Sequence, residues 1–379
     1  MQGRAGSYIK QSEDYVAFIP MPLPPNPEIS YDAELIKLLS QANRELGRLD
    51  GTAETLPNPD LFVSMYVKKE AVLSSQIEGT QASLTDVLVF ESDEDIKNLP
   101  KDVGEVVNYV KAMNYGLNRL DSLSLSLRLI KEIHGILLEN TRGGNKNLGE
   151  FRRSQNWIGP GGCSLREAVF VPPPVPEMNR AMGELELYMH KDDLVPTLIK
   201  VGLIHSQFET IHPFLDGNGR VGRLLITFLL CQQNILNRPL LYLSYYFKKN
   251  RNEYYNWLMK VRNDGDWEGW LKFFLTGIIE VSIQAISTAK KIINIQNTHN
   301  SLVINKVNTP NSFKLLSAIF IKPILSINDA QSQLDITYPT ASNLFSKFEE
   351  IGILQEITGQ QRNRLYAYTE YLNILNDTV

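Results

Sequence analysis

Twelve residues, His212 to Arg223, constrain the fold of this chain more than any other segment. Their sequence is HPFLDGNGRVGR, and they lie between two apolar patterns with helical spacing, so they predict a loop that opens onto the N-terminus of a helix. Glycines at 217, 219 and 222 let backbone N–H groups converge without obstruction by a Cβ atom. Because converging N–H groups at the start of a helix form an anion site, the segment predicts a phosphate-binding loop between two helices.

The side chains of the same segment suit phosphate chemistry. Arg220 and Arg223 offer fixed positive charge and paired N–H donors to phosphate oxygens, and the amide of Asn218 can donate to another. Asp216 supplies a hard oxygen ligand suited to Mg²⁺ that phosphates hold in part. His212 has the one unperturbed pKa in the segment that suits a general base near neutral pH. These groups together favour a phosphoryl- or nucleotidyl-transfer site over a turn that only joins two helices.

Composition limits the classes of protein to which this chain can belong. Hydrophobic residues make up 43% of the 379 residues and charged residues 21%, which is enough to bury ordinary cores in two or three domains. A net charge of -4 and a pI near 5.9 give no reason to expect bulk nucleic-acid or membrane binding. The two cysteines, Cys163 and Cys231, have no metal-type spacing and fit a reducing cytoplasm. The first residues contain no apolar signal-peptide region, and the absence of long apolar runs predicts no transmembrane helix.

Apolar spacing along the chain predicts a mainly helical protein. Residues 1 to about 30 are extended and rich in proline, and residues 151–171 alternate around Gly-Pro-Gly-Gly as a hairpin. The expected helices are 31–42, 61–79, 83–90, 103–120, 127–138, 176–191, 196–210, 224–233, 253–261 and 267–295. We divide the chain into an N-terminal helical region (1–100), a core that contains the twelve-residue segment (101–295), a polar linker (296–309) and a small C-terminal module (310–379).

The twelve-residue segment resembles the signature of the Fic family, H-x-F-x-[DE]-G-N-G-R-x-x-R, and agrees with it at every fixed position. The segments GEFRRSQ (149–155) and HSQFETIHPF (205–214) also resemble this family, and the resemblance covers roughly residues 30 to 290. It implies a helical bundle with a β-hairpin flap. It also implies an enzyme that transfers AMP from ATP, with Mg²⁺, to Ser, Thr or Tyr hydroxyl groups of target proteins and of itself.

The resemblance assigns roles to individual residues. His212 would deprotonate the target hydroxyl, and Asp216 would bind Mg²⁺. The flap would align the target by strand addition through Ile158, Gly159, Val169 and Phe170. The residues expected to bind ATP are Gly217, Asn218, Gly219, Arg220, Val221, Gly222 and Arg223, with Arg223 at the γ-phosphate, and Lys249, Tyr254 and Tyr255 around the base. His205, which shares a helix face with His212, is expected to be a hydrogen-bonded core histidine and not a metal ligand.

The segment Ser74 to Thr80 resembles the inhibitory motif of the same family, [ST]-x-x-x-E-[GN]. Ser74 and Glu78 share one helix face, and Gly79 is placed to end that helix. A Glu78 carboxylate paired with Arg223 would occupy the group that should hold the γ-phosphate. ATP could then bind only with its α-phosphorus out of line with the attacking oxygen, which lowers the rate. The alternative is that Glu78 is an ordinary surface acid.

The C-terminal module, residues 310–379, resembles a winged helix, with three helices followed by a hairpin around Gly359. The module has five basic residues and seven acidic ones, and only the wing, with Arg362 and Arg364, is locally basic. The basic residues are Lys314, Lys322, Lys347, Arg362 and Arg364, and the acidic ones are Asp329, Asp335, Glu349, Glu350, Glu356, Glu370 and Asp377. DNA readers present clustered positive charge, so protein docking or a homodimer contact is favoured over DNA binding.

Two other functions stay open at this point. A related enzyme of the same fold could transfer phosphate, UMP or phosphocholine, although both arginines and the metal acid favour AMP. A protein of another class would be a transcriptional regulator with a nucleotide-sensing core.

Overall fold

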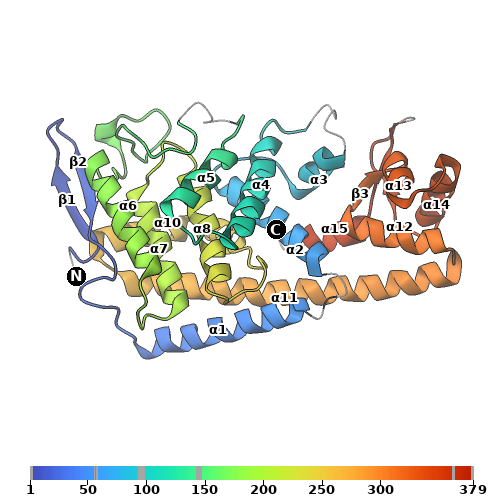
Figure 1. The fold of residues 1–379 in the computed structure, drawn as a ribbon, viewed down its shortest axis with the longest axis horizontal. Coiled ribbons are helices and arrows are strands. Elements are labelled where there is room, and N and C mark those ends of the chain that lie inside the picture. Colours follow the sequence, from blue (N-terminus) through green and yellow to red (C-terminus); the bar gives the residue numbers. More distant parts are fainter. Residues whose placement is uncertain are drawn as a thin grey trace.

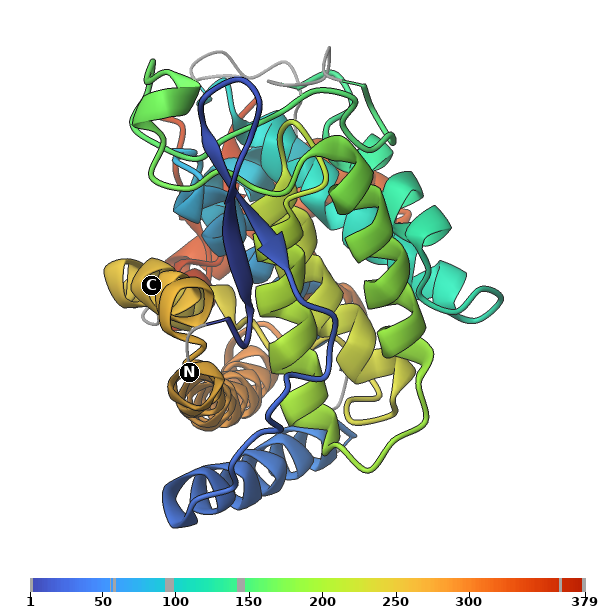
Figure 2. The same cartoon turned by 90° about the vertical axis from the view of Figure 1, so that its left-hand side faces the viewer.

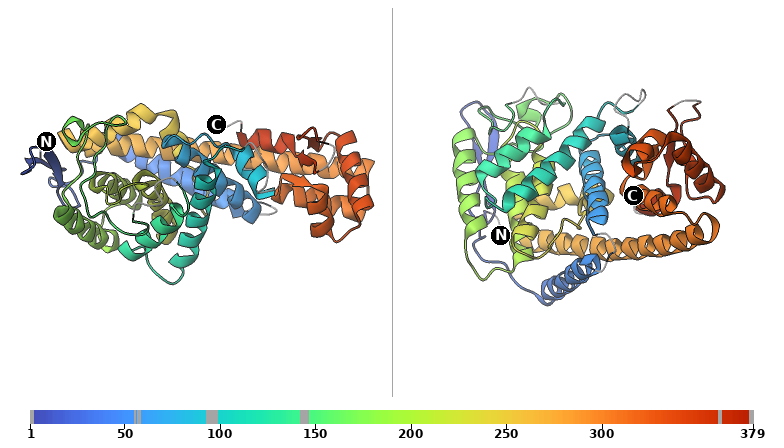
Figure 3. Two further views of the ribbon diagram at one scale, coloured as in Figure 1. Left: turned by 90° about the horizontal axis from the view of Figure 1, so that it is seen from above. Right: turned by 45° about the vertical axis from the view of Figure 1, so that its right-hand side comes forward.

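Helix α11 (Trp267–Lys306) runs along almost the full length of the molecule, and the other elements are arranged around it (Figure 1). This computed structural model describes residues 3–54, 56, 59–92, 99–141, 147–360 and 363–376. Helix α1 (Ala33–Glu54) packs against the first part of α11, and the C-terminal elements lie at its other end (Figures 1 and 3). The buried side chains Leu35, Leu46 and Leu49 of α1 recur at helical spacing, which explains the packed face of this helix.

The remaining helices of the N-terminal two thirds form a bundle above α11, which confirms the predicted mainly helical class (Figure 1). They are α2 (Pro59–Ile77), α3 (Leu84–Ser92), α4 (Val103–Leu120), α5 (Leu127–Leu137), α6 (Val175–His190), α7 (Thr197–Ile211), α8 (Asn218–Gln232), α9 (Ser244–Lys249) and α10 (Arg251–Asp264).

Helices α7 and α8 lie at the centre of this bundle. Apart from Thr197 and Lys200, every residue of α7 is buried, and so is every residue of α8 from Arg220 to Leu230. Helix α7 contacts α6, α8, α10 and α11, while α8 also contacts α4 and α5. Because both helices are enclosed, the ends of the loop that joins them are fixed in position.

The extended N-terminus forms an antiparallel hairpin of β1 (Gly6–Lys10) and β2 (Val16–Pro20), which the sequence analysis does not predict. Tyr8 pairs with Phe18 across the two strands, and their rings meet edge to face at 5.0 Å. The backbone N–H of Phe18 donates to the carbonyl of Val171 at 2.9 Å, so the hairpin lies beside the segment that follows the predicted flap (Figure 2).

The stretch expected to be a polar linker, 296–309, is helical as far as Lys306, because α11 continues through it. His299 and Val303 are buried on this part of the helix. The Nδ1 atom of His299 lies 2.6 Å from the hydroxyl of Tyr368 in the C-terminal module. Contacts with that module therefore stabilise this stretch as a helix although its own sequence is polar. The other domain boundaries stay predictions.

The C-terminal module combines helices with a small antiparallel sheet in the strand order β3-β5-β4. The hairpin predicted around Gly359 is present, with Glu356 opposite Tyr366. The elements are α12 (Pro310–Ile321), β3 (Ile324–Ser326), α13 (Ile327–Leu334), α14 (Tyr338–Glu350), β4 (Gln355–Glu356), β5 (Leu365–Ala367) and α15 (Thr369–Asn376). The resemblance to a winged helix stays a prediction, and Arg362 and Asp377 lie outside the described residues.

This module also contacts the N-terminal region directly. The ammonium group of Lys69 on α2 donates to the carbonyl of Leu375 on α15 at 3.0 Å. The hydroxyl of Ser92, at the end of α3, donates to the carbonyl of Ile324 on β3 at 2.6 Å. Helix α2, itself part of the bundle, thus also contacts the module.

Helix α11 is also long and apolar enough to cross a membrane by length and composition alone, and no other helix in the described ranges passes that test. Its apolar window is 67% buried inside the fold, as expected for a core helix.

Candidate active site

The loop between α7 and α8 begins and ends with residues in the left-handed conformation. His212, which follows the last residue of α7, has φ 51° and ψ 60°, and Gly217, which precedes α8, has φ 76°. The N–H of His212 donates to the carbonyl of Phe208 at 2.9 Å and closes α7. The two reversals bring the residues 212–217 back over the N-terminus of α8, as the glycines of the motif predict.

Asn218 has a structural role within the loop. Its side-chain oxygen accepts from the N–H of Phe214 at 2.8 Å, and its side-chain NH₂ donates to the carbonyl of Phe214 at 2.8 Å. The residue is buried, so this amide holds the loop closed. The oxygen and one N–H of this amide are therefore engaged within the loop, and the expected contact of Asn218 with a phosphate stays a prediction.

His212 is held by its backbone carbonyl. This oxygen accepts from Nε of Arg152 at 3.1 Å and from the side-chain amide of Asn156 at 3.2 Å. The Nδ1 atom of His212 lies 3.4 Å from the carbonyl of Glu209, which places the ring proton on Nδ1 and the lone pair on Nε2. Burial, with a further contribution from the guanidinium of Arg262, lowers the pKa of His212 to about 4. The imidazole is therefore neutral at pH 7 and able to accept a proton.

Asp216 and Arg220 line a cavity of about 510 Å³ at the N-terminal end of α8. One carboxylate oxygen of Asp216 accepts from the N–H of Gly217 at 2.7 Å and lies 3.9 Å from the guanidinium of Arg220. Arg220 in turn donates to the carboxylate of Glu105, at the start of α4, at 3.0 Å. The other lining residues are Glu78, Gly79, Thr80, Lys101, Asp102, Gly104, Asn140 and Thr141.

Arg223 on α8 forms an ion pair with Glu78, which lies just beyond the end of α2. The guanidinium NH2 of Arg223 lies 2.6 Å from a carboxylate oxygen of Glu78. Ser74 holds the same guanidinium through its hydroxyl, 2.8 Å from Nε, and through its carbonyl, 3.0 Å from NH2. Although burial alone lowers the pKa of Arg223, nearby negative charge, foremost that of Glu78, more than offsets it and keeps this pKa above its usual value.

The glycine at 219 permits this arrangement. A Cβ atom on Gly219 would lie 2.2 Å from a carboxylate oxygen of Glu78 and 3.0 Å from NH1 of Arg223. The Glu78 carboxylate thus lies against the first turn of α8, in the place where the motif predicts an anion. Gly79 follows with φ 102°, and α2 ends at Ile77, two residues before it.

Two other motif residues make contacts inside the protein. The side chain of Val221 is buried, and its N–H donates to the carbonyl of Gly217 at 3.0 Å. Its expected contact with ATP stays a prediction. The carbonyl of Gly222 lies 2.9 Å from Nδ1 of His205. A Cβ on Gly222 would lie 2.2 Å from a carboxylate oxygen of Glu209, whose pKa burial raises to about 7. Gly222 thus allows α7 and α8 to approach closely.

The residues expected around the base separate into three environments. Lys249 forms an ion pair with Glu280 of α11 at 2.5 Å, and its expected place around the base stays a prediction. The hydroxyl of Tyr254 is 2.9 Å from Nε2 of His205, which confirms that His205 is a hydrogen-bonded core histidine. Tyr255 remains partly exposed, and Arg251 lies over its ring while donating to the carbonyl of Ile77, next to Glu78.

The predicted flap contains an antiparallel bridge between Ile158 and Phe170. The N–H of Ile158 donates to the carbonyl of Phe170 at 2.8 Å, and Phe170 is buried beneath the guanidinium of Arg262 at 3.8 Å. Val169 is 62% exposed, and Ile158 is 37% exposed. A Cβ on Gly159 would lie 2.6 Å from the sulfur of Cys163. The flap thus exposes the apolar side chains of Ile158 and Val169.

Some residues at this site are not predicted by the sequence analysis. Arg152 is buried in the GEFRRSQ segment, whose resemblance to the family was the one available signal, and it fixes the His212 carbonyl. His134 on α5 lies 3.2 Å from the carbonyl of Asp216 and stacks on Phe214 with ring centroids 3.7 Å apart. Glu105 and His134 are far from the motif in sequence, and no pattern marks them.

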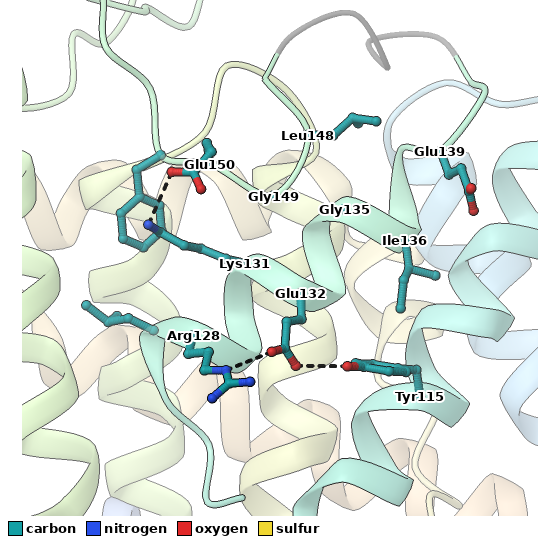
Figure 4. A pocket seen from close by; sticks show the side chains of 12 residues that line it. Tyr115, Arg128, Lys131, Glu132, Gly135, Ile136, Glu139, Leu148, Gly149 and Glu150 are labelled. Carbon is teal, nitrogen blue, oxygen red and sulfur yellow. Dashed lines mark hydrogen bonds and ion pairs between the residues drawn. The ribbon is translucent and has the colours of Figure 1, made fainter.

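A larger hollow of about 920 Å³ is lined by α5, Tyr115 and residues 148–151 and contains no residue of the motif (Figure 4). Its polar groups bind each other, since Glu132 accepts from both Arg128 and Tyr115 at 2.9 Å. Lys131 pairs with Glu150 at 3.3 Å in the same wall. We therefore do not assign the nucleotide to this hollow.

Comparison with solved structures shows that the fold is shared. A Fic family protein from Desulfovibrio desulfuricans superposes with a TM-score of 0.60 at 20% identity, covering 90% of this chain and 97% of that chain. A Fic domain containing signaling protein from Bacteroides thetaiotaomicron gives a TM-score of 0.52 at 18% identity, covering 68% of this chain and 97% of that chain.

Curated relatives are similar over part of their length. A protein from Aquifex aeolicus named probable protein adenylyltransferase is 27% identical over 178 residues, which are 46% of this chain and 51% of that protein. The protein adenylyltransferase Fic of Drosophila virilis is 30% identical over 218 residues, which are 54% of this chain and 41% of that protein. The chain therefore spans about half the length, or less, of these relatives.

Two family models match neighbouring parts of the chain. Residues 36–118 match the Fic/DOC family N-terminal model, and residues 124–230 match the Fic/DOC family model. The first match includes Ser74, Glu78 and Glu105, and the second includes the whole loop from His212 to Arg223. With the shared fold and this loop at its centre, the chain belongs to the Fic/DOC family.

Proposed function

We propose that this chain is a protein adenylyltransferase that moves AMP from ATP to Ser, Thr or Tyr hydroxyl groups of target proteins and of itself. The observation that carries the proposal is the convergence of a neutral histidine, a carboxylate and two arginines around the N-terminus of α8. Relatives named protein adenylyltransferases support it.

The proposed reaction needs one proton acceptor and an anion site. The target hydroxyl oxygen attacks the α-phosphorus and forms a new P–O bond, while the bond from that phosphorus to the oxygen bridging to the β-phosphate breaks and pyrophosphate leaves. Nε2 of His212 takes the hydroxyl proton. Arg220, Arg223 and the backbone N–H groups at the start of α8 bind the phosphates.

The residues present fit a magnesium ion. The Asp216 carboxylate is a hard oxygen donor, its side chain is 31% exposed, and it lines the cavity beside Arg220. One carboxylate together with substrate phosphates and water is a set of ligands that Mg²⁺ commonly has in proteins. Bound there, Mg²⁺ would neutralise charge on the phosphates.

We also propose that Glu78 inhibits the chain. Its carboxylate takes the guanidinium of Arg223 that would hold the γ-phosphate, and it lies against Gly219 at the anion site. ATP bound beside this ion pair would have its triphosphate displaced, which misaligns the α-phosphorus.

The flap supports target binding by strand addition. Ile158 and Val169 are exposed, and the bridge at Ile158 leaves an adjacent edge for an extended segment of a target protein. For the C-terminal module, protein docking or a homodimer contact is proposed ahead of DNA binding because its charge balance is acidic. A cytoplasmic location and the lack of membrane binding remain part of this proposal.

Mass spectrometry of the labelled product tests the function. The Glu78→Gly variant, incubated with ATP, Mg²⁺ and a lysate of the source cells, should add the mass of AMP to Ser, Thr or Tyr residues. The matched control is Glu78→Gly with His212→Ala, which should add nothing. A mass of phosphate, or labelling only with UTP or a phosphocholine donor, would replace AMP transfer with a related reaction. Salt-dependent DNA retardation with no labelling would instead favour the regulator.

A further inference from the structure

We infer that His134 is a positioning residue for Asp216: it holds the Asp216 carbonyl from helix α5 and so fixes the direction of the metal-binding carboxylate. The inference rests on the metal role of Asp216 in the proposed function. It adds a residue that lies outside the twelve-residue motif and does not touch the substrate.

The contacts of His134 determine its tautomer. The ring is fully buried, and Nδ1 lies 3.1 Å from the backbone nitrogen of Gly149. An amide N–H can only donate, so Nδ1 is the acceptor and the ring proton is on Nε2. Nε2 therefore donates to the carbonyl of Asp216, 3.2 Å away. Both ring nitrogens are used in one defined arrangement.

Stacking fixes the ring plane as well. The His134 ring lies parallel to the ring of Phe214, with an interplanar angle of 6°. Phe214 is itself held at its N–H and its carbonyl by the side chain of Asn218. The donor direction of Nε2 is thus set by the loop on one side and by α5 on the other.

The Asp216 carbonyl is a point where the loop could otherwise rotate. The next residue, Gly217, has φ 76°, and a glycine restricts rotation of the preceding peptide less than any other residue. One carboxylate oxygen of Asp216 already accepts from the N–H of that peptide at 2.7 Å. Rotation of the peptide would therefore carry the carboxylate away from the cavity that it lines.

The same short segment fixes both ends of the loop. Gly149 binds His134, which holds Asp216, while Arg152 donates to the carbonyl of His212 at 3.1 Å. The N–H of Arg152 also donates to the carbonyl of Pro213 at 2.9 Å. The spacing between the proton acceptor and the metal carboxylate is thus set by residues 149–152 and α5. Groups that orient a metal ligand through hydrogen bonds commonly change metal affinity by about 10- to 100-fold when they are removed.

Three substitutions separate the two hydrogen bonds of His134. His134→Phe keeps the ring and its stacking on Phe214 but removes both bonds. His134→Gln places an amide near the position of Nε2 and can donate to Asp216 again. His134→Asn reaches only the position of Nδ1 and can accept from Gly149 alone.

The test is manganese binding, followed by electron paramagnetic resonance as a stand-in for Mg²⁺, in the presence of an ATP analogue that cannot transfer AMP. All variants carry Glu78→Gly, so that the triphosphate site is open. We expect His134→Phe and His134→Asn to weaken Mn²⁺ binding about tenfold or more and His134→Gln to recover much of it. Binding of the analogue without metal should change less than twofold in all three.

Several outcomes would overturn the inference. Mn²⁺ binding by His134→Phe equal to that of its parent would do so, and so would equal binding by His134→Gln and His134→Asn. The latter comparison applies even if His134→Phe does not fold, which thermal unfolding monitors. No Mn²⁺ bound by the parent, or full binding by Asp216→Asn, would also overturn it. AMP transfer is measured separately, so a parent that binds Mn²⁺ but transfers nothing counts against the proposed function alone.

Discussion

Replacing Glu78 with glycine removes the carboxylate that pairs with Arg223, and we expect AMP transfer to rise. Arg223 should stay in place after the change, because Ser74 accepts from its Nε at 2.8 Å and from its NH2 at 3.0 Å. The N–H of NH2 that donated to Glu78 can then bind the γ-phosphate. The substitution should cost helix α2 little stability, since Glu78 already lies beyond its last residue, Ile77, and next to Gly79.

The size of the effect follows from the environment of the pair. Arg223 has a side chain that is 2% exposed, but that of Glu78 is 36% exposed, so solvent screens the attraction in part. A charge-assisted hydrogen bond in such a half-buried place contributes roughly 1.5 to 3 kcal/mol. If ATP must break this bond to bind productively, its affinity in the productive arrangement should increase by about 10- to 150-fold in Glu78→Gly.

Two variants make the test specific. Glu78→Gln keeps the length of the side chain and removes its charge, so it should activate less than glycine, because the amide still lies against Gly219. Adding Arg223→Ala to Glu78→Gly should cancel the gain, since the gain depends on the freed guanidinium. The assay is incorporation of labelled AMP over time, with self-modification expected first, and calorimetry gives the ATP affinity. A Glu78→Gly variant that is no more active and binds ATP no better than the parent would refute the inhibitory role.

Three further predictions concern His212, Asp216 and Lys69. His212→Ala in the Glu78→Gly background should lower AMP transfer by at least about 100-fold and leave ATP binding, measured by calorimetry, nearly unchanged. With His212 intact, the rate of AMP transfer should stay constant from pH 8 to about 5 and fall as the pH approaches 4. The reason is that burial lowers the pKa of His212 to about 4, and protonation occupies Nε2. Asp216→Ala, or excess chelator, should stop transfer, and undiminished labelling in chelator would exclude the metal role. Burial lowers the pKa of Lys69 to about 7, below the usual value near 10.4. The folded chain therefore loses this proton at a lower pH than the unfolded chain, and the contribution of Lys69 to the free energy of unfolding increases as the pH rises from 7 to 10. Lys69→Met should reduce this increase in denaturant unfolding, and an unchanged dependence on pH would contradict the assignment.

Much of the site could be predicted because its chemistry is local in sequence. Glycines and charged residues within twelve positions define an anion loop at a helix start, and the structure places residues 212–217 at the start of α8. The Ser74 and Glu78 pair could be assigned to one helix face from its spacing of four, and the structure contains the ion pair of Glu78 with Arg223. The mainly helical class follows from apolar spacing in the same way.

What could not be predicted depends on which polar groups are satisfied inside the fold. The Asn218 amide and the N–H of Val221 are used within the loop and helix, which no spacing reveals. Lys249 donates to Glu280, which lies 31 positions later in the sequence on α11. Residues 296–306 are polar, yet they stay helical because His299 and Val303 are buried on the side of α11 that meets the C-terminal module. These are tertiary effects that override local preference.

The bond between Lys69 and Leu375 also has a consequence for the order in which the chain is made. The two residues are 306 positions apart, so a ribosome that adds about 5 to 20 residues per second needs roughly 15 to 60 seconds to pass from one to the other. During that time helix α2, which ends just before Glu78, lacks its contact with α15. Nascent chains arrested before residue 369 should therefore expose Lys69 to amine-reactive reagents, whereas completed chains should protect it.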